Sequence, residues 1–284
     1  MKIGVNLLLY ATAITKEHRG LLEAMRAAGA DGVEVPIMEG GVEAYAELGR
    51  VLDDLGLART SSMAFTSPDA NPVSEDPLRR QGAADHLNWL IDCAHALGAT
   101  VICGPMFQTI GQFTGGGATE QELEWAAGAL RHAADRAGGA GITLALEPLN
   151  RFECYLINTL EQGAAFTRRV GHPSVGVLFD TFHANMEEKD MARAVREHGG
   201  GVIRHVHCSA NDRGVPGEGH IPWGGVFGAL KSIGYDDWLV IEAFGRSLPG
   251  LAAATKIWRD LFADPLDVAR VGIPFVRGAW NAAG

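Results

Sequence analysis

The chain has 284 residues, 47% of them hydrophobic and 20% charged, which is ordinary globular composition with enough length for one large core. Its net charge of −10, without basic runs, argues against a surface for nucleic acid or for an anionic membrane. No apolar segment reaches the ~20 residues of a membrane span, and the four cysteines form no CxxC pair, so we expect a cytoplasmic protein with reduced thiols.

Short apolar or β-branched runs alternate along the chain with longer segments of helical periodicity, such as GLLEAMRAAGA and AADHLNWLIDCAHALGA, and glycines mark the helix ends. Eight such runs, at roughly 35 residues per unit, predict an α/β fold, a (β/α)₈ TIM barrel, as a single domain over residues 1–284. The runs are KIGVNLLL (2–9), GVEVPI (32–37), ARTSSMAF (58–65), TVICGPM (100–106), ITLALEP (142–148), VGVLFD (175–180), GVIRHVHCS (201–209) and DWLVIEAF (237–244).

Two features at the ends of the chain bear on this prediction. A doubly wound open sheet is the alternative fold, but the first strand is not followed by the glycine fingerprint that such sheets use to bind phosphates. The segment from about Asp264 is expected to form a terminal helix that closes the barrel, although Pro274 interrupts its helical pattern.

Ionisable side chains stand at the ends of the last four predicted strands. Glu147 follows the fifth strand, Asp180 ends the sixth and Glu242 follows the eighth. The seventh strand carries His205 and His207, which share one face because a strand has a period of two. Each residue alone can be an ion-pair partner, a helix cap or a core histidine. In a TIM barrel, however, the carboxyl ends of all strands meet at one rim, where the chemistry takes place.

Three carboxylates at one rim would repel one another, and a divalent cation relieves that repulsion. Three carboxylates and one imidazole suit Mn²⁺, Mg²⁺ or Co²⁺ better than a structural zinc site. Such an ion polarises the carbonyl of a bound sugar and acidifies the neighbouring C–H bond. Glu147 and Glu242 come from separated parts of the barrel wall, so they can flank the substrate as acid and base.

Four segments resemble the signatures of a known family: LEPLNRFE, FDTFHANMEE, HVHCSANDRGVPGEGHIPW and VIEAF. They are similar to those of the D-tagatose 3-epimerase and D-psicose (allulose) 3-epimerase family, within the xylose isomerase-like sugar isomerases and epimerases. The resemblance implies a TIM barrel that epimerises free ketoses at C3 through a cis-enediolate, with a divalent metal, most often Mn²⁺. It implies metal ligands at Glu147, Asp180, His207 and Glu242, and makes the two glutamates the catalytic acid/base pair.

The resemblance also implies three substrate-binding residues, Glu153, His183 and Arg213. Each has a structural interpretation as well: Glu153 as a loop carboxylate, His183 as the start of the next helix, and Arg213 as an exposed residue of the glycine- and proline-rich loop NDRGVPGEG. His205 is interpreted as a histidine that supports the ligand from behind or belongs to the core.

The amino-terminal half departs from the family pattern. Only Tyr10 stands where several epimerases have an aromatic cluster, and after the fourth strand Phe107, Gln112 and Phe113 replace a tryptophan that many members place over the substrate. These positions are expected to hold the far end of the sugar. A pocket built from Leu, Met and Phe side chains would offer few hydrogen bonds to the distal hydroxyls of the sugar. We therefore expect the pocket to accept several ketoses.

Other interpretations stay open at this point. Hydroxypyruvate isomerase-like enzymes share the barrel but typically have glutamine where His207 stands, and inosose or dehydroshikimate dehydratases are further relatives. Endonuclease IV-type barrels need more histidines and a basic surface, which the charge disfavours. A metal-assisted sugar-binding barrel is the alternative outside enzymes. By analogy with the family, the partners are a ketose and further copies of the chain, as a homodimer or homotetramer.

Overall fold

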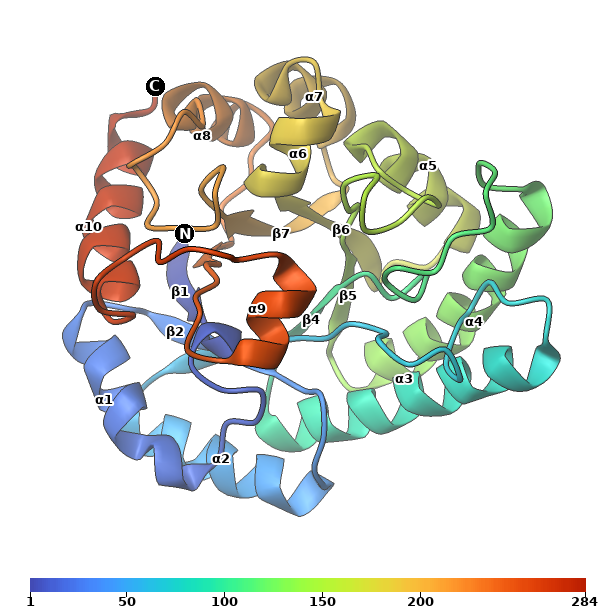
Figure 1. Ribbon diagram of the computed structural model, residues 1–284, viewed down its shortest axis with the longest axis horizontal. Helices are drawn as coiled ribbons and strands as arrows, with labels where there is room; N and C mark the ends of the chain where they lie inside the picture. The colour runs from blue at the N-terminus through green and yellow to red at the C-terminus, as the bar shows by residue number, and fades with distance from the viewer.

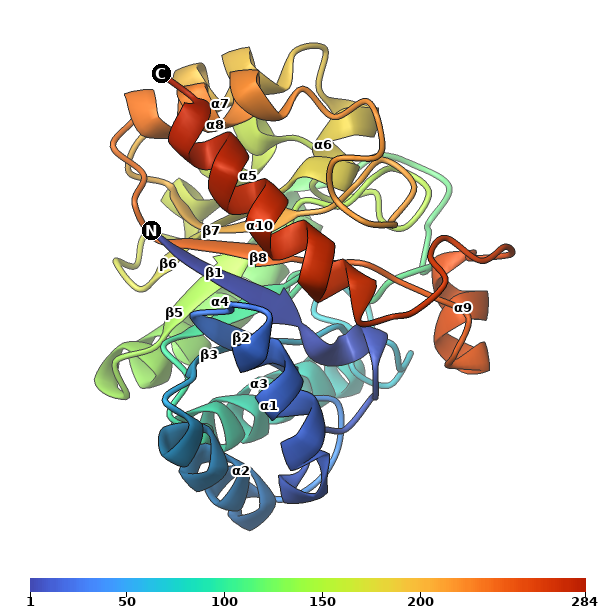
Figure 2. The same cartoon turned by 90° about the vertical axis from the view of Figure 1, so that its left-hand side faces the viewer.

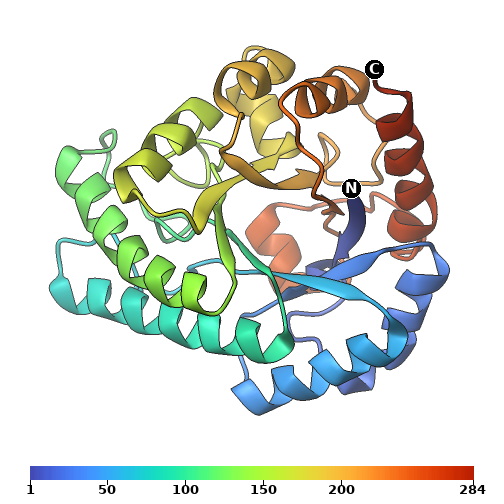
Figure 3. The same cartoon turned by 180° about the vertical axis from the view of Figure 1, so that it is seen from behind.

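The computed structural model describes residues 1–284 and shows a closed barrel of eight parallel strands inside a ring of helices (Figures 1 and 3). Each strand pairs with the next in chain order, and β8 pairs with β1 to close the barrel. The eight predicted strands are all present and the predicted fold class is confirmed. The strands are β1 (Lys2–Asn6), β2 (Gly32–Pro36), β3 (Ala58–Ser62), β4 (Val101–Gly104), β5 (Thr143–Leu146), β6 (Val175–Asp180), β7 (Ile203–Cys208) and β8 (Trp238–Ile241).

The outer helices follow the strands and are capped by local sequence. The side chain of Thr119, for example, accepts from the backbone N–H of Glu122 while Glu122 bonds back to the Thr119 N–H, so α4 starts with a capping box. The helices of the ring are α1 (Arg19–Ala27), α2 (Val42–Leu55), α3 (Pro77–Leu97), α4 (Glu120–Gly139), α5 (Leu160–Val170), α6 (Thr181–Glu187), α7 (Met191–His198), α8 (Trp223–Ser232) and α10 (Asp267–Ala282).

The carboxyl end of the chain forms α10, which contains Pro274 within it and packs against α8, β1 and β8. Our sequence analysis expected a helix here from about Asp264, three residues before the observed start at Asp267. No helix of the protein is both long enough and apolar enough to cross a membrane.

Apolar side chains fill two separate spaces because alternate strand residues point into the barrel and out towards the helices. The large core lies between the barrel and its helices and includes Ile3, Val33 and Leu144. A smaller cluster of Val101, Cys103, Ala145 and Leu178 fills part of the barrel interior. The interior also holds Trp238, which lies against Gly4 and Gly32, and the polar side chains of Glu34, Thr60 and His205.

One short helix lies outside the ring. Helix α9 (Pro249–Thr255) follows β8 and lies across the end of the barrel to which the strands point (Figure 2). Leu251, Ala254 and Thr255 of this helix line the same cavity as the strand-end glutamates. The fold thus closes one part of the barrel mouth with a segment from the last fifth of the chain.

Candidate active site

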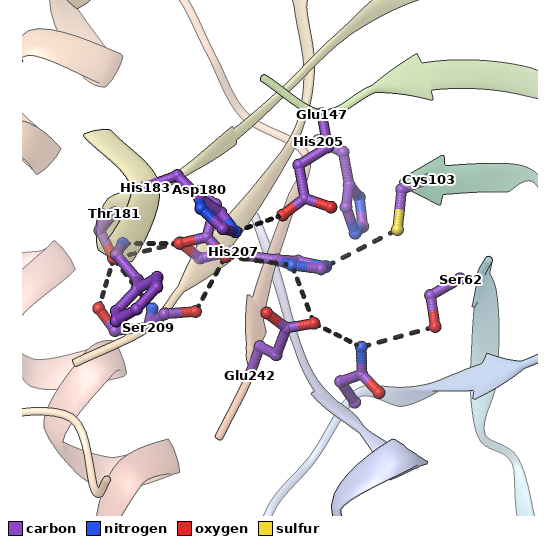
Figure 4. Close-up of polar contacts among 12 residues, drawn as sticks. Ser62, Cys103, Glu147, Asp180, Thr181, His183, His205, His207, Ser209 and Glu242 are labelled. Carbon is purple, nitrogen blue, oxygen red and sulfur yellow. Dashed lines mark hydrogen bonds and ion pairs between the residues drawn. The ribbon is translucent and has the colours of Figure 1, made fainter. Parts of the chain in front are cut away.

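The structure brings the four predicted metal ligands together. Glu147 follows β5, Asp180 ends β6, His207 lies in β7 and Glu242 follows β8, and one ligand atom from each lies within 4.8 Å of those of the others (Figure 4). All four side chains are buried, with exposed fractions between 1% and 7%. Adjacent strands of a parallel barrel place their last residues at one rim, which explains why residues 95 positions apart meet here.

Backbone contacts fix where Glu147 and Asp180 stand. The N–H of Glu147 donates to the carbonyl of Gly104 at 3.1 Å. Gly104 has φ +132°, and a Cβ there would lie 2.0 Å from the carbonyl oxygen of Met63, so only glycine fits. Asp180 Oδ1 accepts from the backbone N–H of Phe182 at 2.6 Å and caps α6. Asp180 is therefore both a helix cap and a member of the cluster.

Arg213 lies inside the cluster, which corrects the interpretation of it as an exposed loop residue. Its Nη1 donates to Asp180 Oδ2 at 3.0 Å and to Glu242 Oε2 at 2.5 Å, and only 6% of the residue is exposed. The guanidinium lies 3.9 Å from the ring centroid of Phe182 and 5.0 Å from that of Phe244. Its backbone is left-handed, with φ 66°, a costly conformation that recurs at functional sites.

Burial and neighbouring charges set the protonation of these groups. Burial and the nearby Glu242 carboxylate raise the pKa of Glu147 well above its usual range. Burial would also raise the pKa of Asp180, but Arg213, His207 and His183 together outweigh it and hold that pKa below the usual range. Burial and Arg213 together lower the pKa of His183 to about 3, so His183 is neutral at physiological pH. The cluster thus contains carboxyl groups with opposite proton affinities.

The residues fit a divalent cation. His207 Nε2 donates to Glu34 Oε1 at 2.7 Å, so the other ring nitrogen, Nδ1, faces the cluster. Nδ1 is buried without a hydrogen-bond partner, 3.6 Å from Asp180 Oδ2 and 3.5 Å from Glu242 Oε1. Three carboxyl groups thus converge around a single arginine, and besides burial their mutual repulsion contributes to the raised pKa of Glu147. A divalent cation that prefers oxygen ligands with one imidazole would offset the carboxylate charge and would take Nδ1 as a ligand in place of a proton.

The other expected substrate contacts lie beside this cluster. His183 Nε2 is 3.5 Å from Glu147 Oε1, and its Nδ1 accepts from the backbone N–H of Asn150 at 3.0 Å. Glu153 is half-buried and accepts from Asn150 Nδ2 at 2.9 Å. Both side chains line the cavity next to the four candidate ligands. His205 does not line it and instead lies below the rim, bonded to Glu34 Oε2 at 2.7 Å.

A cavity of about 170 Å³ opens at the cluster and has two unlike halves. The half formed by β5–β8 and the loops after them is ionic, and we call it the polar half. The other half is formed by the ends of β1–β4, their loops and α9, and we call it the apolar half. The polar half contains Glu147, Glu153, His183, His207, Arg213 and Glu242, and also the apolar side chains of Leu149, Phe182 and Phe244; the apolar half contains Leu8, Met38, Met63, Ala64, Ile110, Leu251 and Ala254, with Ser62, Thr66 and Thr255 as its side-chain hydroxyls.

The residues expected to hold the far end of the sugar are not in the cavity. Phe107 is fully buried and packs against Phe166 in the core, while Gln112 and Phe113 line a separate surface depression near Trp125. The expectation failed because the chain turns inward directly after β4. The apolar lining comes instead from the loops after β1–β3, from Ile110 and from α9.

Sequence analysis also missed residues that hold the cluster in place. Asn6 and Glu34 lie in β1 and β2 below the rim, and Phe182 and Phe244 flank Arg213. A charged residue inside the apolar strand GVEVPI was a signal for Glu34, because an acidic side chain in such a strand needs partners. Nothing in the sequence distinguishes Asn6 or the two phenylalanines from ordinary strand and loop residues.

Comparison with known proteins assigns the chain to a family. The xylose isomerase-like TIM barrel model matches residues 22–266. A ketose 3-epimerase of Arthrobacter globiformis is 33% identical over 286 residues, covering 99% of this chain and 98% of that protein. An L-ribulose 3-epimerase of Mesorhizobium japonicum is 31% identical over 278 residues, covering 97% of this chain and 93% of that protein.

Solved structures agree with this assignment. A structure of L-ribulose 3-epimerase superposes with a TM-score of 0.93 at 30% sequence identity, and the match covers 99% of this chain and 95% of that one. The fold is thus shared from end to end, with about a third of the aligned residues identical to those of the ketose 3-epimerase of Arthrobacter globiformis. The chain belongs to the xylose isomerase-like TIM barrel family and, within it, to the ketose 3-epimerases, which are isomerases.

Proposed function

We propose that the protein interconverts the C3 epimers of free ketohexoses and ketopentoses, such as D-fructose and D-psicose, D-tagatose and D-sorbose, or L-ribulose and L-xylulose. The observation that carries this proposal is the pair Glu147 and Glu242, two buried carboxyl groups from separated strands that line one cavity. Epimerisation at carbon needs a base on one face of the substrate and an acid on the other.

The same two glutamates, with Asp180 and His207, are proposed to hold a divalent cation, with Mn²⁺ preferred and Co²⁺ or Mg²⁺ as alternatives. When bound, the cation polarises the substrate carbonyl and offsets the negative charge of the enediolate. A carboxylate that coordinates through one oxygen retains a second oxygen for proton exchange. The titration of these groups therefore belongs to the cluster and not to single residues.

The chain's own side chains orient the two proton carriers. Arg213 donates to Glu242 Oε2, and Asn6 Nδ2 donates to Glu242 Oε1 at 3.1 Å, so both oxygens of Glu242 have fixed directions. We propose that Glu147 and Glu242 remove the C3 proton and return one from opposite faces, through a cis-enediolate.

Substrate contacts are proposed for Glu153, His183 and Arg213, which face the cavity beside the proton carriers. Arg213 is the only lysine or arginine that lines the cavity, and its Nη1 already donates to Asp180 and Glu242. The cavity has no other basic side chain for a phosphate group, which supports free ketoses as substrates. The apolar half supports acceptance of several ketoses, because it offers few hydrogen bonds to distal hydroxyls.

The test is deuterium incorporation followed by NMR. The protein is stripped of metal and incubated in D₂O with D-fructose, D-tagatose or L-ribulose, with and without Mn²⁺. Deuterium at C3, appearance of the C3 epimer and dependence on Mn²⁺ are expected. Exchange at C1 with formation of an aldose would assign the aldose–ketose isomerase reaction instead. Absence of exchange with all three ketoses, with Mn²⁺ present, would contradict the proposal.

Location and assembly also remain proposals. The four cysteines are buried and form no disulfide, which supports a reducing compartment such as the cytoplasm. A homodimer or homotetramer is supported by exposed large side chains such as Phe152, 75% exposed, and Trp258, 69% exposed.

A further inference from the structure

A second group of ionisable side chains lies directly beneath the candidate metal centre. At the centre of this group is Glu34, which is fully buried inside the barrel. Glu34 lies within β2 and does not line the cavity at the cluster. Five side chains surround its two carboxylate oxygens at 2.7 to 3.2 Å. They are Asn6, Thr60, Cys103, His205 and His207, and they come from β1, β3, β4 and β7.

This group is a hydrogen-bonded network and not a second metal site. Glu34 Oε1 and Oε2 lie 2.7 Å from His207 Nε2 and His205 Nε2. Two atoms that both ligate one tetrahedral zinc ion, each about 2 Å from it, are about 3.3 Å apart. The oxygen–nitrogen distances of 2.7 Å in this group would have to lengthen before a metal could be bound by both atoms. A carboxylate only accepts hydrogen bonds, so Glu34 accepts from Nε2 of both histidines.

The network determines which nitrogen of His207 faces the proposed cation. Since Nε2 donates its hydrogen bond to Glu34, Nδ1 is the ring nitrogen that faces the cluster, where it has no hydrogen-bond partner. Figure 4 shows the ring of His207 extending between the carboxylate cluster on one side and Cys103 on the other. A carboxylate behind a ligating imidazole is the usual way in which proteins fix its tautomer and ring direction.

A second path leads from Glu34 to one of the proposed proton carriers. Asn6 Nδ2 donates to Glu34 Oε1 at 3.0 Å and to Glu242 Oε1 at 3.1 Å. Its own amide is oriented by the backbone, because Asn6 Oδ1 accepts from the N–H of Leu8 at 2.9 Å. Two of the four candidate ligands, His207 and Glu242, are thus connected through one buried carboxylate.

We propose that Glu34 is a positioning residue of the metal centre, which holds His207 with Nδ1 towards the cation and, through Asn6, fixes one oxygen of Glu242. This inference depends on the ligand set of the proposed function but not on its substrate or reaction. Its tests can therefore measure metal binding alone, with no sugar present.

The first test compares Mn²⁺ affinity, by isothermal titration calorimetry, of the wild type and Glu34→Gln. Glutamine has the same size, but its amide nitrogen must face one of the two histidines as a donor. The expected result is a Kd for Mn²⁺ about 10- to 100-fold higher. The matched control is Glu122→Gln. It removes a buried carboxylate at the start of α4 that bonds to Tyr155 and Thr119 and does not line the cavity at the cluster. Its Mn²⁺ affinity is expected to equal that of the wild type.

A second measurement does not depend on any variant being folded. In the wild type loaded with Mg²⁺, which is diamagnetic, long-range ¹H–¹⁵N NMR distinguishes the two nitrogens of His207. The proposal expects a proton on Nε2 and a ligated Nδ1. A proton on Nδ1, or a folded Glu34→Gln protein with unchanged Mn²⁺ affinity, would overturn it. Wild type that binds Mn²⁺ as expected but exchanges no C3 proton would contradict the epimerase proposal and leave this one standing.

Discussion

The two halves of the cavity differ in almost every physical respect. The polar half gathers buried carboxyl, imidazole and guanidinium groups from β5–β8, each held by hydrogen bonds and several with strongly shifted pKa values. The apolar half gathers Leu, Met, Ile and Ala side chains from the β1–β4 loops and α9. On the proposed function, the chemistry is therefore concentrated at one end of the substrate, while the other end meets the apolar side chains.

This division has an energetic consequence. Loss of a buried, charged hydrogen-bond partner leaves another charge unpaired and is costly, whereas an apolar wall distinguishes ligands by only about 1–3 kcal/mol per methylene. Substitutions in the polar half should therefore remove activity, and those in the apolar half should adjust it. The predictions below test that contrast, from the largest expected effect to the smallest.

Replacement of a proton carrier is the strongest test. Glu147→Gln or Glu242→Gln removes both a proton-exchanging oxygen and one negative charge from the cluster. General acid–base catalysis contributes about 10²–10⁴-fold, so we expect kcat to fall by at least about 10³ in either variant. The readout is the rate of C3 deuterium exchange, with Glu122→Gln as the control for loss of a buried carboxylate. Near-native exchange by Glu242→Gln would rule out the two-glutamate mechanism.

Arg213 separates substrate binding from metal binding. Arg213→Ala removes donors that face the cavity, so we expect KM for the ketose to rise about 10- to 100-fold, the equivalent of a charged hydrogen bond. The same change leaves the carboxylates of Asp180 and Glu242 less compensated, so Mn²⁺ affinity should not weaken. Steady-state kinetics and calorimetry together check this. A weaker affinity for Mn²⁺ with unchanged KM would instead assign Arg213 a purely structural role.

Metal removal should make stability depend on pH in a particular direction. Burial lowers the pKa of His207, but Glu34 and Glu242 outweigh it and raise that pKa well above 6.5 in the cation-free protein. A raised pKa means that the folded state binds the proton more tightly than the unfolded state. Protonated His207 therefore stabilises the folded state fully below about pH 6.5, and this stabilisation is lost as the pH rises through the pKa of His207 in the folded state. Glu147, also raised, acts in the same direction from its ordinary value of 4.5 upwards.

A bound cation replaces those protons, so Mn²⁺ should stabilise the protein more at pH 9 than at pH 6.5. At 100 times its Kd, the ion contributes about 2.7 kcal/mol, which corresponds to several degrees in Tm. Differential scanning fluorimetry with Mn²⁺ or with a chelator measures the difference, and K⁺ at equal ionic strength serves as the control. A stabilisation that shrinks as the pH rises would contradict the assigned charges.

The smallest effect is expected in the apolar half. Leu251→Ser on α9 removes apolar surface from the cavity wall but no charge or hydrogen bond, so kcat/KM should change by less than about tenfold for each ketose. The exchanged hydrogen should remain that of C3. Val271→Ser, at a residue of α10 that is 50% exposed and outside the cavity, is the matched control. A loss of 10³-fold or more in Leu251→Ser would show that α9 contributes to the chemistry itself.

The candidate metal ligands at the rim could be predicted from sequence, but the residues that hold them in place could not. Glu147, Asp180, His207 and Glu242 stand at the ends of strands that can be recognised from their own residues. Asn6 ends β1 and Glu34 lies within β2, and neither polar residue has an obvious meaning until its neighbours from other strands are known. Sequence analysis therefore identified the candidate ligands and missed what holds them.

Loops set the other limit. Arg213 was predicted to bind substrate from the resemblance alone, since the residue types of its loop fit an exposed arginine equally well; its position inside the cluster, with a left-handed backbone, is seen only in the structure. Phe107 was expected over the substrate, yet it packs into the core. Both outcomes depend on where a loop is directed by distant elements, which residue type alone does not encode.

What the sequence by itself determined is the barrel and its ionic rim. Strand and helix periodicity is local, and a closed parallel barrel brings every strand's carboxyl end to the same side, so strand-end residues meet whatever the loops do. The network under His207, the inward turn of Arg213 and the cover formed by α9 could be seen only in the folded structure. These depend on contacts between segments far apart in the chain, which only the folded packing brings together.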